Sequence, residues 1–270
     1  MPALPASEVP SSPENMPFAA PCRTLDRTAP LRWLRLGWAD LMRAPRLSLA
    51  YGAVLTALSV LIAALSWRYG LAALYLGLAT GFIFVGPILA VGLYSISRQL
   101  SMGRTPVMGY CLREGWHHIR ELLVLGIVLL VVMLVWARAA ATLHVFFPVE
   151  SNPGFDQWLP FLGIGSGVGA LFTLIVFSIS AFSLPMIMDR KVDSITAVVT
   201  SVNAVLRNKK PLLLWACLIG LSVVLGFATA FVGFAVLLPL IGHATWHAYQ
   251  ETIDASGWPQ NEASQGDTAY

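Results

Sequence analysis

Charged side chains are scarce in this chain. They make up 11% of its 270 residues, whereas a soluble domain carries about 25%. Apolar residues make up 57%. Because a water-soluble protein could not cover its surface with so few charges, we infer that lipid surrounds much of the chain. The formal net charge of +3 is also too small to indicate nucleic acid as a partner.

Cysteine is scarce as well. The three residues, Cys22, Cys111 and Cys217, lie far apart and show no paired spacing, which argues against a disulfide framework and a thiolate metal centre. The chain also lacks a nucleotide-binding loop, a zincin helix and a catalytic serine pattern. We therefore expect neither enzymatic activity nor a bound cofactor or metal ion.

The longest uncharged stretch runs from Pro211 to Tyr249 and contains no Asp, Glu, Lys or Arg in 39 residues. One transmembrane helix needs about 20 apolar residues to cross the hydrocarbon core. The stretch therefore predicts two crossings, joined by a tight turn between Gly226 and Gly233.

The same length criterion predicts four more crossings upstream. A tight turn separates the first two, and a loop with Pro and Gly separates the next two. With the final pair they predict an all-α integral membrane protein with six transmembrane helices, arranged as three hairpins. The four upstream crossings are Leu47–Ser66, Leu71–Tyr94, Leu122–Ala141 and Leu159–Met188.

A short amphipathic helix is predicted before each hairpin. Within Leu31–Arg43, the apolar side chains, Trp38 among them, fall on one helical face and Asp40 lies opposite. Asp193–Leu206 has an apolar stripe in the same way, with Thr200 facing away from it. Because Arg and Lys flank these helices, we expect them to lie on the cytosolic surface of the membrane.

Three units of similar layout follow one another, at residues 31–99, 106–191 and 193–254. Each contains an amphipathic helix, a crossing, a turn and a second crossing, which suggests an internal triplication. Any six-helix protein looks periodic at this coarse level, so both interpretations stay open. The flanking ends, residues 1–30 with seven prolines and the polar residues 255–270, are predicted to be disordered. Residues 1–30 also contain no apolar core of a cleavable signal peptide.

The distribution of basic residues predicts the orientation in the membrane. Of the 17 Lys and Arg residues, only Arg68 and Arg138 lie on the side opposite the three amphipathic helices. Positive residues accumulate on the cytoplasmic side of membrane proteins. We therefore expect both chain ends, with the amphipathic helices, in the cytoplasm.

The fourteen carboxylates all fall in tails, loops or helix ends. Asp189 and Asp193, for example, lie just after the fourth crossing. Proton-coupled transporters and pumps commonly use an acid buried in the membrane. We expect no buried acid, and this argues against both of those functions.

Five histidines are present, and two of them, His243 and His247, are four residues apart on the last helix. This spacing places both on one helical face, close to Trp246. Such a pair can bind a metal ion or a haem, or it can hydrogen-bond to neighbours at the end of a helix. We favour the second interpretation and expect no metal. The candidate residues for a ligand or partner site are His243, Trp246, His247, Asp189 and Asp193.

Prolines and glycines mark places where helices are expected to bend or pack closely. Pro87, Pro185 and Pro239 each lie in the second helix of a hairpin and are expected to kink it. Gly163 and Gly167 form a small-xxx-small pair that would let another helix approach. A substrate path lined by such small residues is the alternative interpretation.

Several strings of residues resemble one bacterial family of integral membrane proteins, known as domain of unknown function 2189. The resemblance extends over about residues 30–254 and implies an inner-membrane protein with no established activity and no catalytic residues. Some relatives are labelled cytochrome c oxidase subunits. Five histidines are too few for a catalytic oxidase subunit, so only an accessory role near a respiratory complex stays open. The strings are Trp38–Leu41, Gly86-Pro87 with Gly92–Tyr94, Phe182–Met186 with Asp189 and Asp193, and Leu238–Tyr249.

Three functions are consistent with these observations. The favoured one is a structural or accessory membrane protein that binds lipid or a partner through its cytosolic helices. A permease or facilitator for a small neutral or hydrophobic solute is the first alternative. The weaker alternative is an accessory redox or haem-associated protein that uses His243 and His247.

Overall fold

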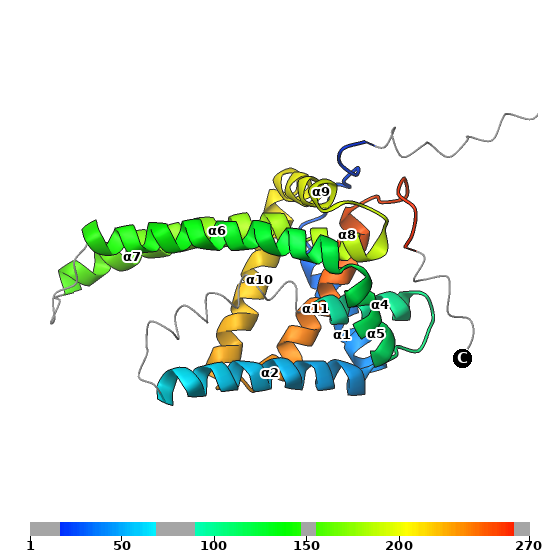
Figure 1. The fold of residues 1–270 in the computed structure, drawn as a ribbon, viewed down its shortest axis with the longest axis horizontal. Coiled ribbons are helices and arrows are strands. Elements are labelled where there is room, and N and C mark those ends of the chain that lie inside the picture. The colour runs from blue at the N-terminus through cyan, green and yellow to red at the C-terminus, as the bar shows by residue number, and fades with distance from the viewer. Residues whose placement is uncertain (1–16, 69–89, 147–154, 262–270) are drawn as a thin grey trace, which may run out of the picture.

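The computed structural model describes residues 17–68, 90–146 and 155–261, and most of these are helical. Figure 1 shows α2, α6 and α7 extending in one direction, away from a compact group that contains α1, α4, α5 and α8. The helices are α1 (Ala29–Arg43), α2 (Pro45–Arg68), α4 (Val91–Ser101), α5 (Met108–His117), α6 (Ile119–Phe146), α7 (Phe155–Ser180), α8 (Ser183–Asp189), α9 (Ser194–Arg207), α10 (Lys209–Ala228) and α11 (Phe234–Thr252).

Four segments of the described residues are long and apolar enough to cross a membrane. They are Pro45–Leu65, Ile119–Leu143, Leu162–Asp189 and Lys209–Ala228. They coincide with four of the predicted crossings and support the prediction of an integral membrane protein. Most of the predicted second crossing, together with Pro87, lies outside the described residues.

Helix α11, the predicted sixth crossing, differs from these four segments. It is a helix over Phe234–Thr252, but it is not among the membrane-length apolar segments. Its second half carries buried polar residues, including His243 and Thr245. It contacts α1, α2, α4, α8 and α10. The polar residues that lower the hydropathy of α11 are therefore in contact with other helices, and they are not exposed to solvent or lipid.

The predicted fourth crossing is two helices and not one. Helix α7 ends at Ser180 and α8 begins at Ser183, so the chain bends just before Pro185, which has no backbone N–H to donate. The hydroxyl of Ser201 in α9 donates to the carbonyl of Ser178, at 2.7 Å, and accepts from the N–H of Phe182, at 3.1 Å. One serine side chain thus satisfies backbone groups on both sides of the break.

The end of the chain before α1 packs against the body, although its composition predicts disorder. The backbone N–H of Ala20 donates to the hydroxyl of Thr200, and that of Leu25 donates to the side chain of Asn208, both at 2.9 Å. Cys22 is buried and forms an isolated β-bridge with Ile253. Side chains of α9 thus hold this proline-containing segment, and residues 1–16 lie outside the described part.

The end of the chain after α11 also packs, contrary to expectation. Trp258 is buried, and the side chain of Asn261 donates to the carbonyls of Ile187 and Met188, at 2.9 and 3.1 Å. These carbonyls belong to the last turn of α8, where helices leave acceptors free. Asn261 therefore caps a helix that is distant in sequence, and the polar composition of the segment serves this capping.

Helix α1 buries one polar side chain, that of Asp40, together with Trp33 and Leu41. Trp33, Gly37 and Asp40 are buried, and the helix packs along α11. Leu31 and Trp38 remain 56% and 48% exposed. The predicted apolar stripe of α1 is therefore divided, since Leu31, Trp38 and Met42 are exposed whereas Leu41 is buried.

In helix α9 the buried face consists of small and polar residues. Its buried residues include Thr196, Thr200 and Ser201, whereas Ile195 and Leu206 are 61% and 59% exposed. In a water-soluble protein the apolar stripe would face the core.

The internal triplication stays a prediction, since its first unit includes residues outside the described part.

Candidate functional site

His243 joins three helices in the core. It is fully buried, and so are Ser48 of α2 and Ser97 of α4. The hydroxyl of Ser48 lies 2.9 Å from Nε2 of the imidazole, and that of Ser97 lies 2.8 Å from Nδ1. A neutral imidazole donates from one nitrogen and accepts at the other, so one serine accepts and the other donates. His243 thus lies in the helical core, whereas we expected it at a polar helix end.

His247 lies one turn further along α11 and has a different partner. Its Nε2 is 2.8 Å from Oδ2 of Asp40, and the Asp40 side chain is 3% exposed. Nη1 of Arg43 lies 3.8 Å from Oδ1 of the same carboxylate. This cluster fastens α1 to α11. The two histidines share a helix face but do not converge on a common ligand position.

Ligation by His243 would require at least one of its two serine contacts to break. Both ring nitrogens of His243 are engaged by hydroxyls, and Nε2 of His247 faces a carboxylate. In the described part of the chain, no group of three or more His, Cys, Asp or Glu residues is arranged to hold a metal ion. The geometry therefore favours hydrogen bonding over ligation for this histidine pair.

Asp189, at the end of α8, connects three helices. It accepts a hydrogen bond from the Tyr249 hydroxyl, at 2.9 Å. Its other carboxylate oxygen lies 3.7 Å from Nε of Arg98, whose side chain is 1% exposed. Arg190 lies on the outer side, with its Nε 3.0 Å from the carboxylate. Trp246 is also buried, and its ring lies 5.7 Å from that of Tyr249.

The expectation that no acid is buried is therefore wrong. Both Asp40 and Asp189 are buried. Their positions at helix ends suggested contact with water, but α11 and the neighbouring helices close over them. Each is paired with a histidine or an arginine, as buried carboxylates require. The argument against proton-coupled transport relied on there being no buried acid, and it is therefore withdrawn.

Asp193 has a local role at the start of α9. Its carboxylate accepts from the backbone N–H groups of Ile195 and Thr196, both at 3.0 Å. Burial acts to raise the pKa of Asp193, but these hydrogen bonds outweigh it, and the pKa lies below its usual value. The residue is a helix N-cap. It is separate from the cluster around Asp189.

Close approach of helices occurs at glycines other than the two expected. Pro239 lies inside α11 and cannot donate to the carbonyl of Ala235, four residues earlier. Gly52 of α2 lies against that carbonyl: a Cβ at this position would be 2.1 Å from the oxygen. Around Gly163 and Gly167 a Cβ would meet nothing within 4 Å among the described residues. Within the described chain this expected packing face is therefore open.

Gly52→Ala is expected to destabilise the folded protein by about 1–3 kcal/mol, because α2 would have to move away from α11. The measurement is the free energy of unfolding in mixed detergent micelles. Gly167→Ala makes the same chemical change in an open position of α7. It is expected to be neutral or to stabilise, since alanine is the better helix former. Equal effects of the two substitutions would contradict the packing described at Gly52.

Several residues of the site gave little signal in the sequence. Ser48 lies between apolar residues on α2, whereas Ser97 and Arg98 lie in a polar run at the end of α4. For Ser48, a polar side chain among apolar neighbours was the available signal. The resemblance strings contained Trp38–Leu41, and hence Asp40, without indicating its role.

Comparison with known proteins finds a family model that matches less than half of the chain. No curated protein and no solved structure matches the chain. The family match is shorter than the expected range of 30–254, and it leaves out Leu238–Tyr249 with His243 and His247. It includes Ser97, Arg98 and Asp189, so only part of the buried cluster falls within it. Residues 74–189 of this chain match the family described as predicted integral membrane protein, domain of unknown function 2189.

Proposed function

We propose that this chain is a non-catalytic accessory protein of the membrane, which binds anionic lipid through a basic layer of helices. The observation that carries the proposal is the outward apolar face of α1 and α9. Helix α9 buries small and polar residues and leaves Ile195 and Leu206 exposed. Helix α1 buries Trp33 and Leu41 but leaves Leu31, Trp38 and Met42 exposed. In water this arrangement would be costly, whereas at a membrane surface it is favourable.

The charges of this layer suit an anionic membrane surface. On α1, Arg35 and Arg43 are exposed beside the apolar stripe. Lys209 and Lys210 are exposed where α9 is followed by α10. Basic residues near the surface of an anionic leaflet each contribute about 1 kcal/mol to attraction. Apolar contact and charge thus support the same orientation.

The proposed topology has six crossings in three hairpins, with both chain ends in the cytoplasm of a bacterium and the helices in its inner membrane. Two observations support it. The ends of the described chain lie together, since the N–H of Asp254 donates to the carbonyl of Pro21, at 2.9 Å. Figure 1 shows both ends beside the group with α8 and α9, away from the far ends of α6 and α7.

The buried cluster supports a structural role and not catalysis. Ser48, Ser97 and His243 are fully buried, and each serine forms a hydrogen bond with His243. A catalytic base must reach a substrate proton at hydrogen-bond distance. The cluster instead joins α2, α4 and α11. Because α1 packs along α11, the cluster would hold α1, a helix of the basic layer, in place.

Lipid analysis tests the proposal directly. The full chain is extracted from its membrane with a polymer that retains surrounding lipid, and the lipid composition of the discs is compared with that of the whole membrane. We expect anionic phospholipids to be enriched around the protein because of its basic, apolar layer. A bulk lipid composition, with no co-purifying membrane-protein partner, would contradict the proposal.

The two alternatives have weaker support. A permease needs a continuous cavity along the bundle, and most of the predicted second crossing lies outside the described residues. That alternative stays a prediction. A redox role would need His243 to exchange one of its serine partners for a ligand. A partner in a respiratory complex also stays a prediction.

A further inference from the structure

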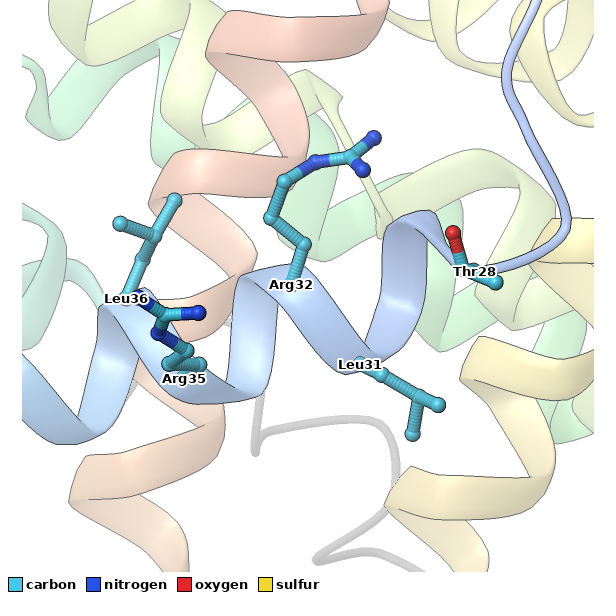
Figure 2. Close-up of a pocket in the computed structure, with 5 residues that line it drawn as sticks. All are labelled: Thr28, Leu31, Arg32, Arg35 and Leu36. Carbon is cyan, nitrogen blue, oxygen red and sulfur yellow. The ribbon is translucent and has the colours of Figure 1, made fainter.

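A groove of about 500 Å³ runs along one flank of α1. This volume is in the range of small-molecule pockets, which is about 300–1,000 Å³. Figure 2 shows Thr28 at one end of the groove and Arg35 with Leu36 at the other, while Arg32 and Leu31 extend to opposite sides of the helix. The described residues that line it are Thr28, Leu31, Arg32, Arg35 and Leu36.

The two arginines of the groove differ in their surroundings. Arg32 forms an ion pair with Glu251 of α11, and the indole N–H of Trp33 donates to the same carboxylate, at 2.8 Å. Burial acts to raise the pKa of Glu251, but these hydrogen bonds outweigh it, so the pKa is lowered and the group is ionised. Arg35 is exposed, and no acidic partner for it is found among the described residues. The uncompensated positive charge of the groove is therefore that of Arg35.

The groove lies along the first half of α1, the helix that precedes a membrane-length helix. Helix α1 ends at Arg43 and α2 begins at Pro45, where a candidate span starts. The exposed side chains of Leu31 and Leu36 flank the guanidinium of Arg35 along the groove. A ligand that fits this pattern has an anionic group and an apolar part. Guanidinium groups bind phosphate oxygens through paired hydrogen bonds.

We propose that this groove holds the headgroup phosphate of one anionic phospholipid. Arg35 donates to the phosphate oxygens, Arg32 adds a second positive charge at the side, and Leu31 and Leu36 contact the glycerol and the upper acyl chains. The inference rests on the proposed function, because it assigns one lipid class to one place in the basic layer. General attraction to an anionic leaflet does not require such a place.

Native mass spectrometry of the full chain in detergent micelles tests the groove. Phosphatidylglycerol and phosphatidylcholine with the same acyl chains are titrated separately, and the dissociation constant of the first bound lipid is determined. The wild type is expected to prefer phosphatidylglycerol. Arg35→Gln is expected to weaken phosphatidylglycerol binding about tenfold or more, because it removes a charge-assisted contact. Phosphatidylcholine binding is expected to change little.

Arg46→Gln is the matched control, since Arg46 is exposed at the start of α2 and does not line the groove. It is expected to bind phosphatidylglycerol as the wild type does. Arg35→Lys keeps the charge but not the planar fork, so an intermediate loss is expected. The unfolding temperature of Arg35→Gln reports whether that variant folds. If it does not fold, Arg35→Lys still tests the groove.

The outcomes separate the groove from the proposed function. If the wild type prefers phosphatidylglycerol and the Arg35 variants behave like Arg46→Gln, the groove is overturned and the general affinity for anionic lipid stands. If the wild type shows no preference between the two lipids, and its membrane discs have bulk composition, both proposals fail. A selective loss in the Arg35 variants supports the groove.

Discussion

His243→Ala is expected to destabilise the folded protein by about 2–6 kcal/mol, because it leaves two buried hydroxyls without their histidine partner. Ser48 and Ser97 are both fully buried, so water cannot replace the lost hydrogen bonds without entering the core. Each unsatisfied hydroxyl costs about 1–3 kcal/mol. The free energy of unfolding in mixed detergent micelles measures the effect.

The control for this experiment is His117→Ala, which removes an exposed imidazole. It is expected to change the free energy of unfolding by less than about 0.5 kcal/mol. A variant that combines His243→Leu, Ser48→Ala and Ser97→Ala removes all three polar groups and should recover much of the lost stability. If His243→Ala were as stable as His117→Ala, the three-helix link would play no part in stability.

Asp189→Ala is expected to cost about 3–5 kcal/mol, the range seen when one partner of a buried ion pair is removed. The substitution takes the carboxylate away from Arg98 and removes the acceptor of the Tyr249 hydroxyl. Since Asp189 is in contact with α4 and α11 from the end of α8, the substitution weakens the packing of all three. Thermal unfolding in detergent is expected at a clearly lower temperature.

Two further variants distinguish the ion pair from the hydrogen bond. Asp189→Asn keeps an acceptor for Tyr249 but loses the charge, so its effect on the free energy of unfolding is expected to be smaller than that of alanine. Asp193→Ala removes a carboxylate that only caps α9, and about 1 kcal/mol is expected. If Asp189→Ala were no more destabilising than Asp193→Ala, the buried ion pair would contribute nothing measurable.

The sequence predicted helices well where their signal is local. The first, third and fifth crossings appear as α2, α6 and α10, with ends within a few residues of those expected. A long apolar run in a helical protein requires lipid or a core around it, and twenty such residues are enough to show this. The break before Pro185 was also visible as a proline in an apolar run, although its exact residues depend on Ser201 from another helix.

The candidate site was predicted only in part. His243, His247 and Asp189 hydrogen-bond to residues of other helices, and the identity of these residues was not foreseen. Their role in binding a ligand or partner stays a prediction. Ser48 is 195 residues from His243 along the chain. Nothing in the local pattern of α2 indicates which other helix will face Ser48. The packing predicted at Gly163 and Gly167 stays a prediction, since a small-xxx-small spacing shows where a helix can approach and not which helix does.

The sequence by itself determined that this chain is an integral membrane protein made of helices, because apolar length and scarcity of charge act residue by residue. Only the tertiary structure decided which polar groups are buried and what pairs with them. Asp40 and His247 are 207 residues apart in the chain and 2.8 Å apart in space. Burial of a charge is a property of everything packed around it, so it depends on contacts that no local stretch of sequence contains.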